Sequence, residues 1–222
     1  MTTLLHPSPV SKTSASEEAV CVDSLSAASI SDEVSPFRKV ALTLEEFLPL
    51  AMEEGFDRQL INGTMWERPM TVRNRRHTAA TARFSQHLNN YLDQTDAVDA
   101  QAFDGEVGVI LPGRETAVGI DVAVFSRETL DQQDDSDTRM FRGLPLLAVE
   151  VLSGSDTIDG VDAKVVEYLA AGVPLIWIAN PLRRSVSAYT ANSERTFHRN
   201  DRLTADILPG FEVVTRQLFG RE

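Results

Sequence analysis

Two acidic residues interrupt stretches of the sequence that are otherwise apolar. Asp121 lies within AVGIDVAVF, residues 117–125, and Glu150 lies within LPLLAVEVL, residues 144–152. An ionised carboxylate in an apolar setting is costly, so it normally becomes protonated, pairs with a positive group or binds a metal ion. These two acids are therefore the first candidates for a functional site.

The alternation of side chains along a strand predicts where the two carboxylates point. Asp121 shares a face with residues 119, 123 and 125, and Glu150 shares a face with residues 146, 148 and 152. If the strands are neighbours, the carboxylates meet near the strand ends and repel each other unless a cation lies between them. Hard oxygen ligands suit Mg²⁺ or Mn²⁺, and the backbone carbonyl of Val151 is a candidate third ligand.

Lys164 is the candidate for the positive group that phosphodiester hydrolysis needs near the nucleophile or the developing charge. It lies in the first turns of a helix predicted over residues 161–172, and Tyr168 follows one turn later on the same face. A bound metal ion would lower the pKa of a water molecule and neutralise charge on the phosphoryl group. These residues together predict metal-assisted phosphodiester hydrolysis.

Each of these residues also has a structural alternative. Asp121 could be a strand-end residue that accepts a backbone N–H, and Glu150 could form a buried ion pair. Lys164 could be a surface lysine that pairs with Glu167 or Asp162. The occurrence of both carboxylates in buried strands, with a lysine downstream, favours a site over these alternatives.

The composition indicates one soluble domain in a reducing compartment. With 222 residues, 42% of them hydrophobic, the chain can bury one sizeable core. The single cysteine, Cys21, excludes a disulfide within the chain and a zinc site built from thiolates. No apolar run approaches the roughly 20 residues that cross a membrane, and the N-terminus lacks a signal-peptide pattern. We expect a cytoplasmic protein with no membrane partner.

The formal net charge of −12 argues against nucleic-acid binding through bulk charge, so such binding requires a local patch. The candidate patch is RPMTVRNRRH, in which Arg68, Arg73, Arg75 and Arg76 precede His77. If the protein binds nucleic acid, we predict that Arg73, Arg75 and Arg76 make the contact. The alternative is an ordinary solvated surface.

The order of predicted elements gives the fold class. Residues 1–40 carry little bulky apolar content and predict a disordered tail, so the folded domain is expected over residues 41–222. Within it the sequence predicts, in order, a helix capped by Thr43 and Glu46, a hairpin turning at Asn62-Gly63, a helix over 74–94, strands over 103–111, 117–125 and 144–152, a helix over 161–172, a buried strand over 173–181 and an edge hairpin with a closing element. This order predicts an α/β or α+β fold with a mixed β-sheet flanked by helices.

At these residues the sequence resembles the Uma-type restriction endonuclease family common in cyanobacteria and other bacteria, a branch of the PD-(D/E)XK nuclease superfamily. The resemblance rests on LINGTMW, His77, GIDVAVF, LLAVEVLSGSD, DAKVVEYLAAGV and WIANP, in this order. It runs from Leu42 to Phe219 and leaves only the N-terminal tail uncovered.

The resemblance implies a restriction-endonuclease-like core, divalent-metal-dependent cleavage of DNA and, in many members, a homodimer. Asp121 and Glu150 fall on the metal-binding aspartate and glutamate of the family. The superfamily's lysine two residues after that glutamate would fall on Leu152, whereas the family's lysine on the following helix falls on Lys164. The resemblance therefore implies the same catalytic residues, Asp121, Glu150 and Lys164, that the positions of the charged residues predict.

Several positions depart from the family pattern. Ile120 replaces the proline before the motif aspartate, Gln59 replaces a glutamate ahead of the hairpin turn, and Asn180 replaces an aspartate. Gly-Ser-Asp at 154–156 replaces the more usual Pro-Ser. These changes leave the predicted Asp121, Glu150 and Lys164 in place.

The leading interpretation is an endodeoxyribonuclease, a hydrolase of phosphodiester bonds that uses Mg²⁺ or Mn²⁺ and has DNA as its partner. A catalytically degenerate nuclease-fold module that binds nucleic acid or protein is the alternative. The acidic net charge and the changes at Gln59 and Asn180 favour that alternative. A metal-dependent hydrolase of small molecules is a third interpretation.

Overall fold

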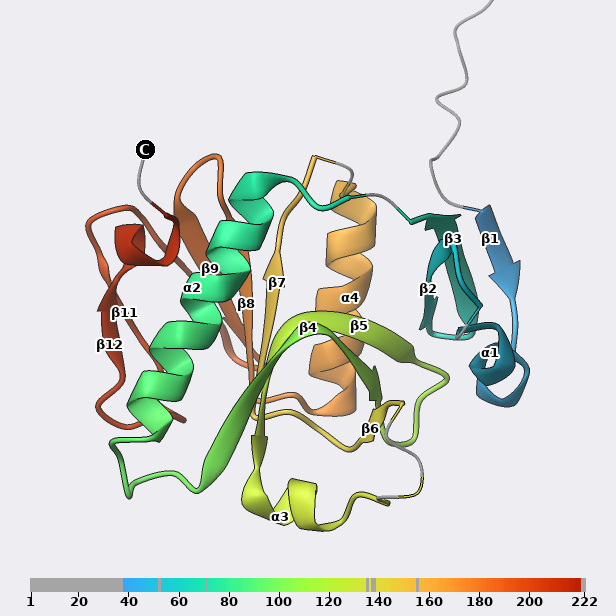
Figure 1. Cartoon of the computed structure of the whole chain (residues 1–222), viewed down its shortest axis with the longest axis horizontal. Helices are drawn as coiled ribbons and strands as arrows, with labels where there is room; N and C mark the ends of the chain where they lie inside the picture. Colours follow the sequence, from blue (N-terminus) through green and yellow to red (C-terminus); the bar gives the residue numbers. More distant parts are fainter. Residues whose placement is uncertain are drawn as a thin grey trace, which may run out of the picture. The chain divides into compact units, whose positions relative to one another are not determined.

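A mixed β-sheet is the frame of the protein in the computed structural model, which describes residues 38–51, 53–70, 72–134, 136, 139–154 and 156–220 (Figure 1). Within these residues ten strands form the sheet, whose main path runs β1-β3-β2-β5-β7-β8-β9-β10, while β4 pairs with both β5 and β6. The strands are β1 (Arg38–Ala41), β2 (Phe56–Ile61), β3 (Thr64–Pro69), β4 (Ala100–Ile110), β5 (Ala117–Ser126), β6 (Phe141–Arg142), β7 (Leu147–Val151), β8 (Leu175–Asn180), β9 (Ser185–Thr190) and β10 (Ser193–Phe197).

Helices and a small second sheet complete the described part of the chain. The second sheet joins β11 and β12 as an antiparallel pair. These elements are α1 (Leu44–Ala51), α2 (Arg75–Leu92), α3 (Arg127–Asp131), α4 (Ile158–Ala171), β11 (Arg202–Thr204), β12 (Glu212–Val214) and the 3₁₀ helix η1 (Thr215–Leu218). The β7–β8 and β4–β6 pairs are parallel and the others antiparallel, so the predicted mixed sheet with flanking helices is confirmed.

The first strand begins ahead of the predicted domain boundary. β1 pairs antiparallel with β3, from Arg38 opposite Glu67 to Ala41 opposite Thr64. The predicted tail over residues 1–40 is therefore wrong for residues 38–40, and residues 1–37 lie outside the described part. Four residues with the sequence RKVA are too short for a periodic apolar pattern, so only pairing with the hairpin identifies this strand.

Local signals in the sequence form the predicted turns and caps. Asn62 and Gly63 have φ angles of 48° and 70°, as a type I′ hairpin turn between β2 and β3 requires. The Thr43 N–H donates to the Glu46 carboxylate at 2.9 Å, and the Glu46 N–H donates to the Thr43 hydroxyl at 3.3 Å, so the predicted capping box is confirmed.

The helix that carries Lys164 begins three residues earlier than predicted. Its N-cap is Thr157, whose hydroxyl accepts the Gly160 N–H, and it ends at Gly172, whose φ angle of 97° terminates the helix in the left-handed region. The short α3, capped by Ser126, lies between the predicted strands over 117–125 and 144–152, where no element is predicted. The only apolar residue of α4 before Val161 is Ile158, which is 80% exposed, and α3 has only five residues, so periodicity identifies neither start.

Two hydrophobic cores cover the two faces of the central strands. On one face α2 packs with Phe84 and Leu88 against Val122, Val149 and Trp177. On the other face α4 packs against alternate residues of the same strands, namely Ala123, Phe125, Ala148, Ile176 and Ile178. Because successive residues of β8 enter opposite cores, its continuous apolar run is explained, as predicted for a strand buried on both faces. The helices thus fix which strand residues meet α2 and which meet α4.

No helix in the described ranges is long and apolar enough to cross a membrane. The cytoplasmic location and the homodimer stay predictions.

Candidate active site

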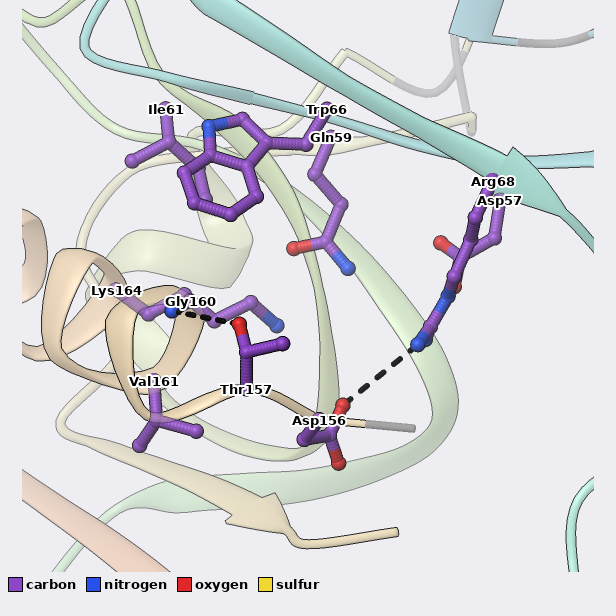
Figure 2. Close-up of a pocket in the computed structure, with 10 residues that line it drawn as sticks. All are labelled: Asp57, Gln59, Ile61, Trp66, Arg68, Asp156, Thr157, Gly160, Val161 and Lys164. Atoms are coloured by element: carbon purple, nitrogen blue, oxygen red, sulfur yellow. Dashed lines mark hydrogen bonds and ion pairs between the residues drawn. The ribbon is translucent and has the colours of Figure 1, made fainter. Parts of the chain in front are cut away.

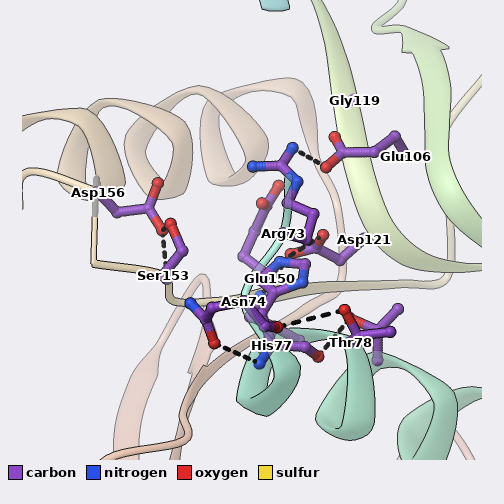
Figure 3. A network of polar contacts seen from close by, with 12 residues as sticks. Arg73, Asn74, His77, Thr78, Glu106, Gly119, Asp121, Glu150, Ser153 and Asp156 are labelled. Carbon is purple, nitrogen blue, oxygen red and sulfur yellow. Dashed lines mark hydrogen bonds and ion pairs between the residues drawn. The ribbon is translucent and has the colours of Figure 1, made fainter. Parts of the chain in front are cut away.

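Asp121 lies in the middle of β5 and Glu150 lies one residue before the end of β7, the strand that pairs with β5. The antiparallel β5–β7 ladder runs from Val124 opposite Leu147 to Val122 opposite Val149. The next residue on each strand is the acid, so the two carboxylates lie next to each other where the ladder ends (Figure 3). The Val151 N–H donates to Asp121 Oδ2 at 2.7 Å, which ties the end of β7 to the Asp121 side chain.

Helix α4 supplies both side chains that bind Glu150. Lys164 Nζ lies 2.9 Å from Glu150 Oε2, and the Tyr168 hydroxyl donates to Glu150 Oε1 at 2.6 Å. Lys164 Nζ also donates to the Gly119 carbonyl at 3.3 Å. Because Lys164 and Tyr168 are four residues apart, they project from one face of the helix toward the same carboxylate.

Helix α2 supplies a partner for Asp121 that the sequence prediction did not include among the site residues. His77 Nε2 lies 3.0 Å from Asp121 Oδ1, and the His77 residue is only 5% exposed. The Asn74 side chain caps the helix by accepting the N–H groups of Arg76 and His77. No sequence spacing predicts a contact between a histidine in the first turn of a helix and an aspartate on a distant strand. From the sequence, His77 could therefore be noted only as part of a family motif.

The surroundings make the two carboxyl groups differ. Burial raises the pKa of Glu150 above its ordinary value, and the negative charge of Asp121 adds to this while Lys164 opposes it. Burial also acts to raise the pKa of Asp121, but His77, the Val151 N–H and Lys164 outweigh it and hold that pKa below its ordinary value. Asp121 therefore stays ionised to lower pH than Glu150.

The structural alternatives for these residues can be compared with the observed contacts. Lys164 forms its ion pair with Glu150, whereas Glu167 accepts two hydrogen bonds from Arg114, at 3.1 and 2.6 Å, and one from Thr116. Lys164 is thus drawn into the site. The alternatives for the two acids are present as well, since Asp121 accepts a backbone N–H and Glu150 forms a buried ion pair.

The donor set at this site fits a magnesium or manganese ion. Within the described residues no three His, Cys, Asp or Glu side chains gather as a metal-binding group. Two carboxylates and the Val151 carbonyl, completed by water molecules, are nevertheless hard oxygen ligands of the kind that Mg²⁺ takes. Each carboxylate oxygen also keeps a lone pair beside its hydrogen bond, so ligation need not displace the present donors.

A family model matches residues 44–217, well over half of the chain, and its family is Uma2, described as "Putative restriction endonuclease". The chain belongs to the Uma2 family. No curated protein matches the chain. Among solved structures, a "putative nuclease belonging to DUF820" from Anabaena variabilis ATCC 29413 is similar, with a TM-score of 0.67 and 19% sequence identity over 80% of this chain and 97% of that chain. This likeness shows a shared fold, which agrees with the restriction-endonuclease-like core implied by the sequence.

Two of the departures from the Uma2 pattern have visible structural roles. Gln59 lines a small cavity of ≈ 50 Å³ together with Trp66, Thr157 and Lys164, and its Oε1 atom is buried with no hydrogen-bond partner among the described residues (Figure 2). Asn180 accepts the N–H groups of the two residues after Pro181, at 3.1 and 3.0 Å, and so shapes the turn that follows β8. Gln59 thus retains a position beside the candidate lysine without a third negative charge.

The predicted arginine patch divides into two groups in this Uma2 chain. Arg73 is paired with Glu106 and lies 3.7 Å from Asp57, so its guanidinium is engaged within the protein (Figure 3). Arg68 likewise pairs with Asp57, at 2.6 Å. Arg75 and Arg76 lie in the first turn of α2 and are exposed to solvent.

Proposed function

We propose that this Uma2-family protein is a divalent-metal-dependent DNA endonuclease. The observation that carries the proposal is the convergence of Asp121, Glu150 and Lys164, from two strands and a helix, where the β5–β7 ladder ends. Membership of the Uma2 family supports hydrolysis of nucleic acid as the reaction.

The residues that would hold the metal ion are Asp121, Glu150 and the carbonyl of Val151. A Mg²⁺ or Mn²⁺ ion bound there supplies an activated water molecule and neutralises negative charge on the phosphoryl oxygens. Within the protein, His77 and the Val151 N–H hold the Asp121 carboxylate in a single orientation, because each contacts a different oxygen of that group. Tyr168 and Lys164 do the same for Glu150, because they too contact different oxygens.

Lys164 is the candidate for the group that acts on the reacting phosphate or water. Its ammonium is held by Glu150 and by the Gly119 carbonyl, so one of its three N–H donors can point to a substrate oxygen. A positive charge fixed in a partly buried site stabilises developing negative charge without reorganisation during the reaction. Its position beside both carboxylates therefore suits transition-state stabilisation.

Arg75 and Arg76 are the arginines that we assign to phosphate contact. Both are exposed and begin the helix that also carries His77. Arg73, which the sequence grouped with them, is better suited to hold the segment before α2 against Glu106.

Cleavage of supercoiled plasmid DNA in the presence of Mg²⁺ or Mn²⁺ tests the proposal. We expect nicked and linear product from the wild-type protein, and a loss of at least about 10²-fold in rate for Asp121→Asn, Glu150→Gln and Lys164→Met. Asp99→Asn is the matched control, because Asp99 is an exposed carboxylate outside the site. Equal rates for the wild type and the two carboxylate variants would contradict the assignment.

The degenerate binding module is the second candidate, and one observation favours it. Both oxygens of Asp121 and both oxygens of Glu150 accept hydrogen bonds or ion pairs from the protein itself, so protein groups alone stabilise the pair. Calorimetric titration with Mn²⁺ separates the candidates. An endonuclease binds Mn²⁺ in the wild type and loses that affinity in Asp121→Asn, whereas the module shows no binding that depends on this carboxylate.

A further inference from the structure

Two adjoining grooves lie between the start of α2 and the turn that follows β8. One has a volume of ≈ 680 Å³ and the other ≈ 410 Å³. They share Arg75, Arg76, Pro181 and Leu182, so they form one continuous depression, which we call the α2 groove. The first part extends to Phe219 and Gly220, near the end of the described chain.

The α2 groove has a charge opposite to that of the protein as a whole. Three arginines, Arg75, Arg76 and Arg184, line it, and among the described residues no aspartate or glutamate does. The whole chain has 33 acidic and 21 basic residues, which gives it a formal net charge of −12. Two other cavities include Asp57, Asp156 or Asp162 in their walls, and one of them adjoins the α2 groove at Leu152, Ser153 and Asn180. A polyanion is therefore accommodated in the α2 groove with least repulsion.

The α2 groove leads to the carboxylate pair. Its second part is lined by Leu152, Ser153 and Gly154, the residues that directly follow the end of β7, where Glu150 lies. Figure 1 shows the start of α2 and the end of β7 at the same end of the sheet. A strand whose phosphate lies at Asp121 and Glu150 can therefore continue into this groove.

The turn after β8 presents Arg184 and an apolar wall to the groove. Asn180 fixes the turn through its side chain, and Arg184 has a φ angle of 51°, in the left-handed region that non-glycine residues rarely occupy. Leu182, at 74% exposure, lines the groove together with these arginines. Backbone strain of this kind persists only where the surrounding structure holds it, and it is concentrated at functional sites. Guanidinium groups beside a small apolar surface suit phosphates flanked by sugar or base.

We propose that the α2 groove binds the polynucleotide strand next to the bond that is cut, with Arg184 as a phosphate-binding residue alongside Arg75 and Arg76. The turn after β8 then acts as a strand-binding element. The identity of the polymer as DNA rests on the proposed function, whereas the polyanion-binding groove rests on charge and shape.

Binding of a fluorescein-labelled 20-base-pair DNA duplex, measured by anisotropy across a KCl series in EDTA, tests the groove. Each phosphate contact contributes a slope of about 0.9 to the fall of log affinity with log salt concentration. We expect the slope to decrease by about 0.9 for Arg184→Gly and by about 2.7 for the combined Arg75→Gln, Arg76→Gln and Arg184→Gly variant. Glycine is chosen because it relieves the positive φ angle, so the loss of charge is not combined with new backbone strain.

Two variants serve as controls. Arg184→Lys keeps the charge and should keep the wild-type slope, and Arg202→Gln removes an exposed arginine from β11, outside the groove, and should also leave the slope unchanged. An unchanged slope in the triple variant, or equal changes in the triple variant and in Arg202→Gln, would overturn the groove assignment.

The outcome is separable from that of the nuclease proposal. Failure of Asp121→Asn to affect plasmid cleavage would remove the catalytic assignment while a reduced salt slope still supported the groove. Conversely, cleavage that depends on Asp121 with an unaltered slope would reject the groove alone.

Discussion

Removal of one hydroxyl, in Tyr168→Phe, tests how the buried carboxylate at the site is stabilised. The Tyr168 side chain is fully buried in the core beneath α4, and its hydroxyl donates to Glu150 Oε1 at 2.6 Å. Burial raises the pKa of Tyr168 well above its ordinary value, so the hydroxyl remains a donor at pH 8. Phenylalanine keeps the ring and its packing and removes only this hydrogen bond.

The size of the effect follows from the charge of the acceptor. A hydrogen bond to an ionised group contributes about 1.5–3 kcal/mol, and this one is short and inaccessible to water. Lys164 remains 2.9 Å from the other oxygen, so Glu150 keeps one partner and the loss should fall near about 2 kcal/mol. For a domain of this size that corresponds to a decrease of about 4–8 °C in Tm.

Urea unfolding at pH 8 measures the difference, with Tyr91→Phe as the matched control. The Tyr91 hydroxyl donates to the Pro209 carbonyl at 2.8 Å in a partly exposed setting, so its loss should cost only about 0.5–1 kcal/mol. With an m value of about 2 kcal/mol per molar, Tyr168→Phe should lower the urea midpoint by about 1 M. Equal midpoints for the two variants would refute the claim that Glu150 is an ionised, buried acceptor.

Two further predictions concern the hairpin that lies beside the site. Gly63→Ala should destabilise the protein by about 1 kcal/mol, because the φ angle of 70° is unfavourable for alanine. Gly154→Ala is the control and should leave stability unchanged, because Gly154 lies in open space and outside the left-handed region. Thermal unfolding of the two variants measures the difference. The hydrogen bond from Arg58 holds the pKa of Glu67 below its ordinary value of 4.5, so its contribution to stability is present above pH 4.5 and is lost as pH falls through the folded-state pKa. Glu67→Gln should therefore have a lower Tm than the wild type at pH 7 and approach it at lower pH, and a constant difference between pH 7 and pH 3 would contradict this.

The family, the fold class and most elements could be predicted from local features of the sequence. The Asn62-Gly63 turn, the Thr43 capping box and the continuous apolar run of β8 each depend on a few adjacent residues, so they can be predicted without a structure. Elements without such a signal were identified only in the structure: β1 by its pairing with β3, and α3 by the cap that Ser126 provides.

The site shows the same division. The alternation of apolar and acidic residues was enough to select Asp121 and Glu150, because a carboxylate in a buried strand is costly wherever that strand lies. The contact between His77 and Asp121 and the pairing of Arg73 with Glu106 were not predictable in this way. Each joins segments that lie more than thirty residues apart, and their proximity depends on strand register and on how α2 packs.

The sequence by itself thus determined which residues could do chemistry, and the tertiary structure decided which of them act together. Grouping by sequence placed Arg73 with Arg75 and Arg76, whereas the fold pairs Arg73 internally and places Arg184 from a distant turn in the same groove as the other two. The physical reason is that charge and the tendency to be buried are properties of a residue type, but orientation and partnership arise only when the core fixes each strand and helix in one register.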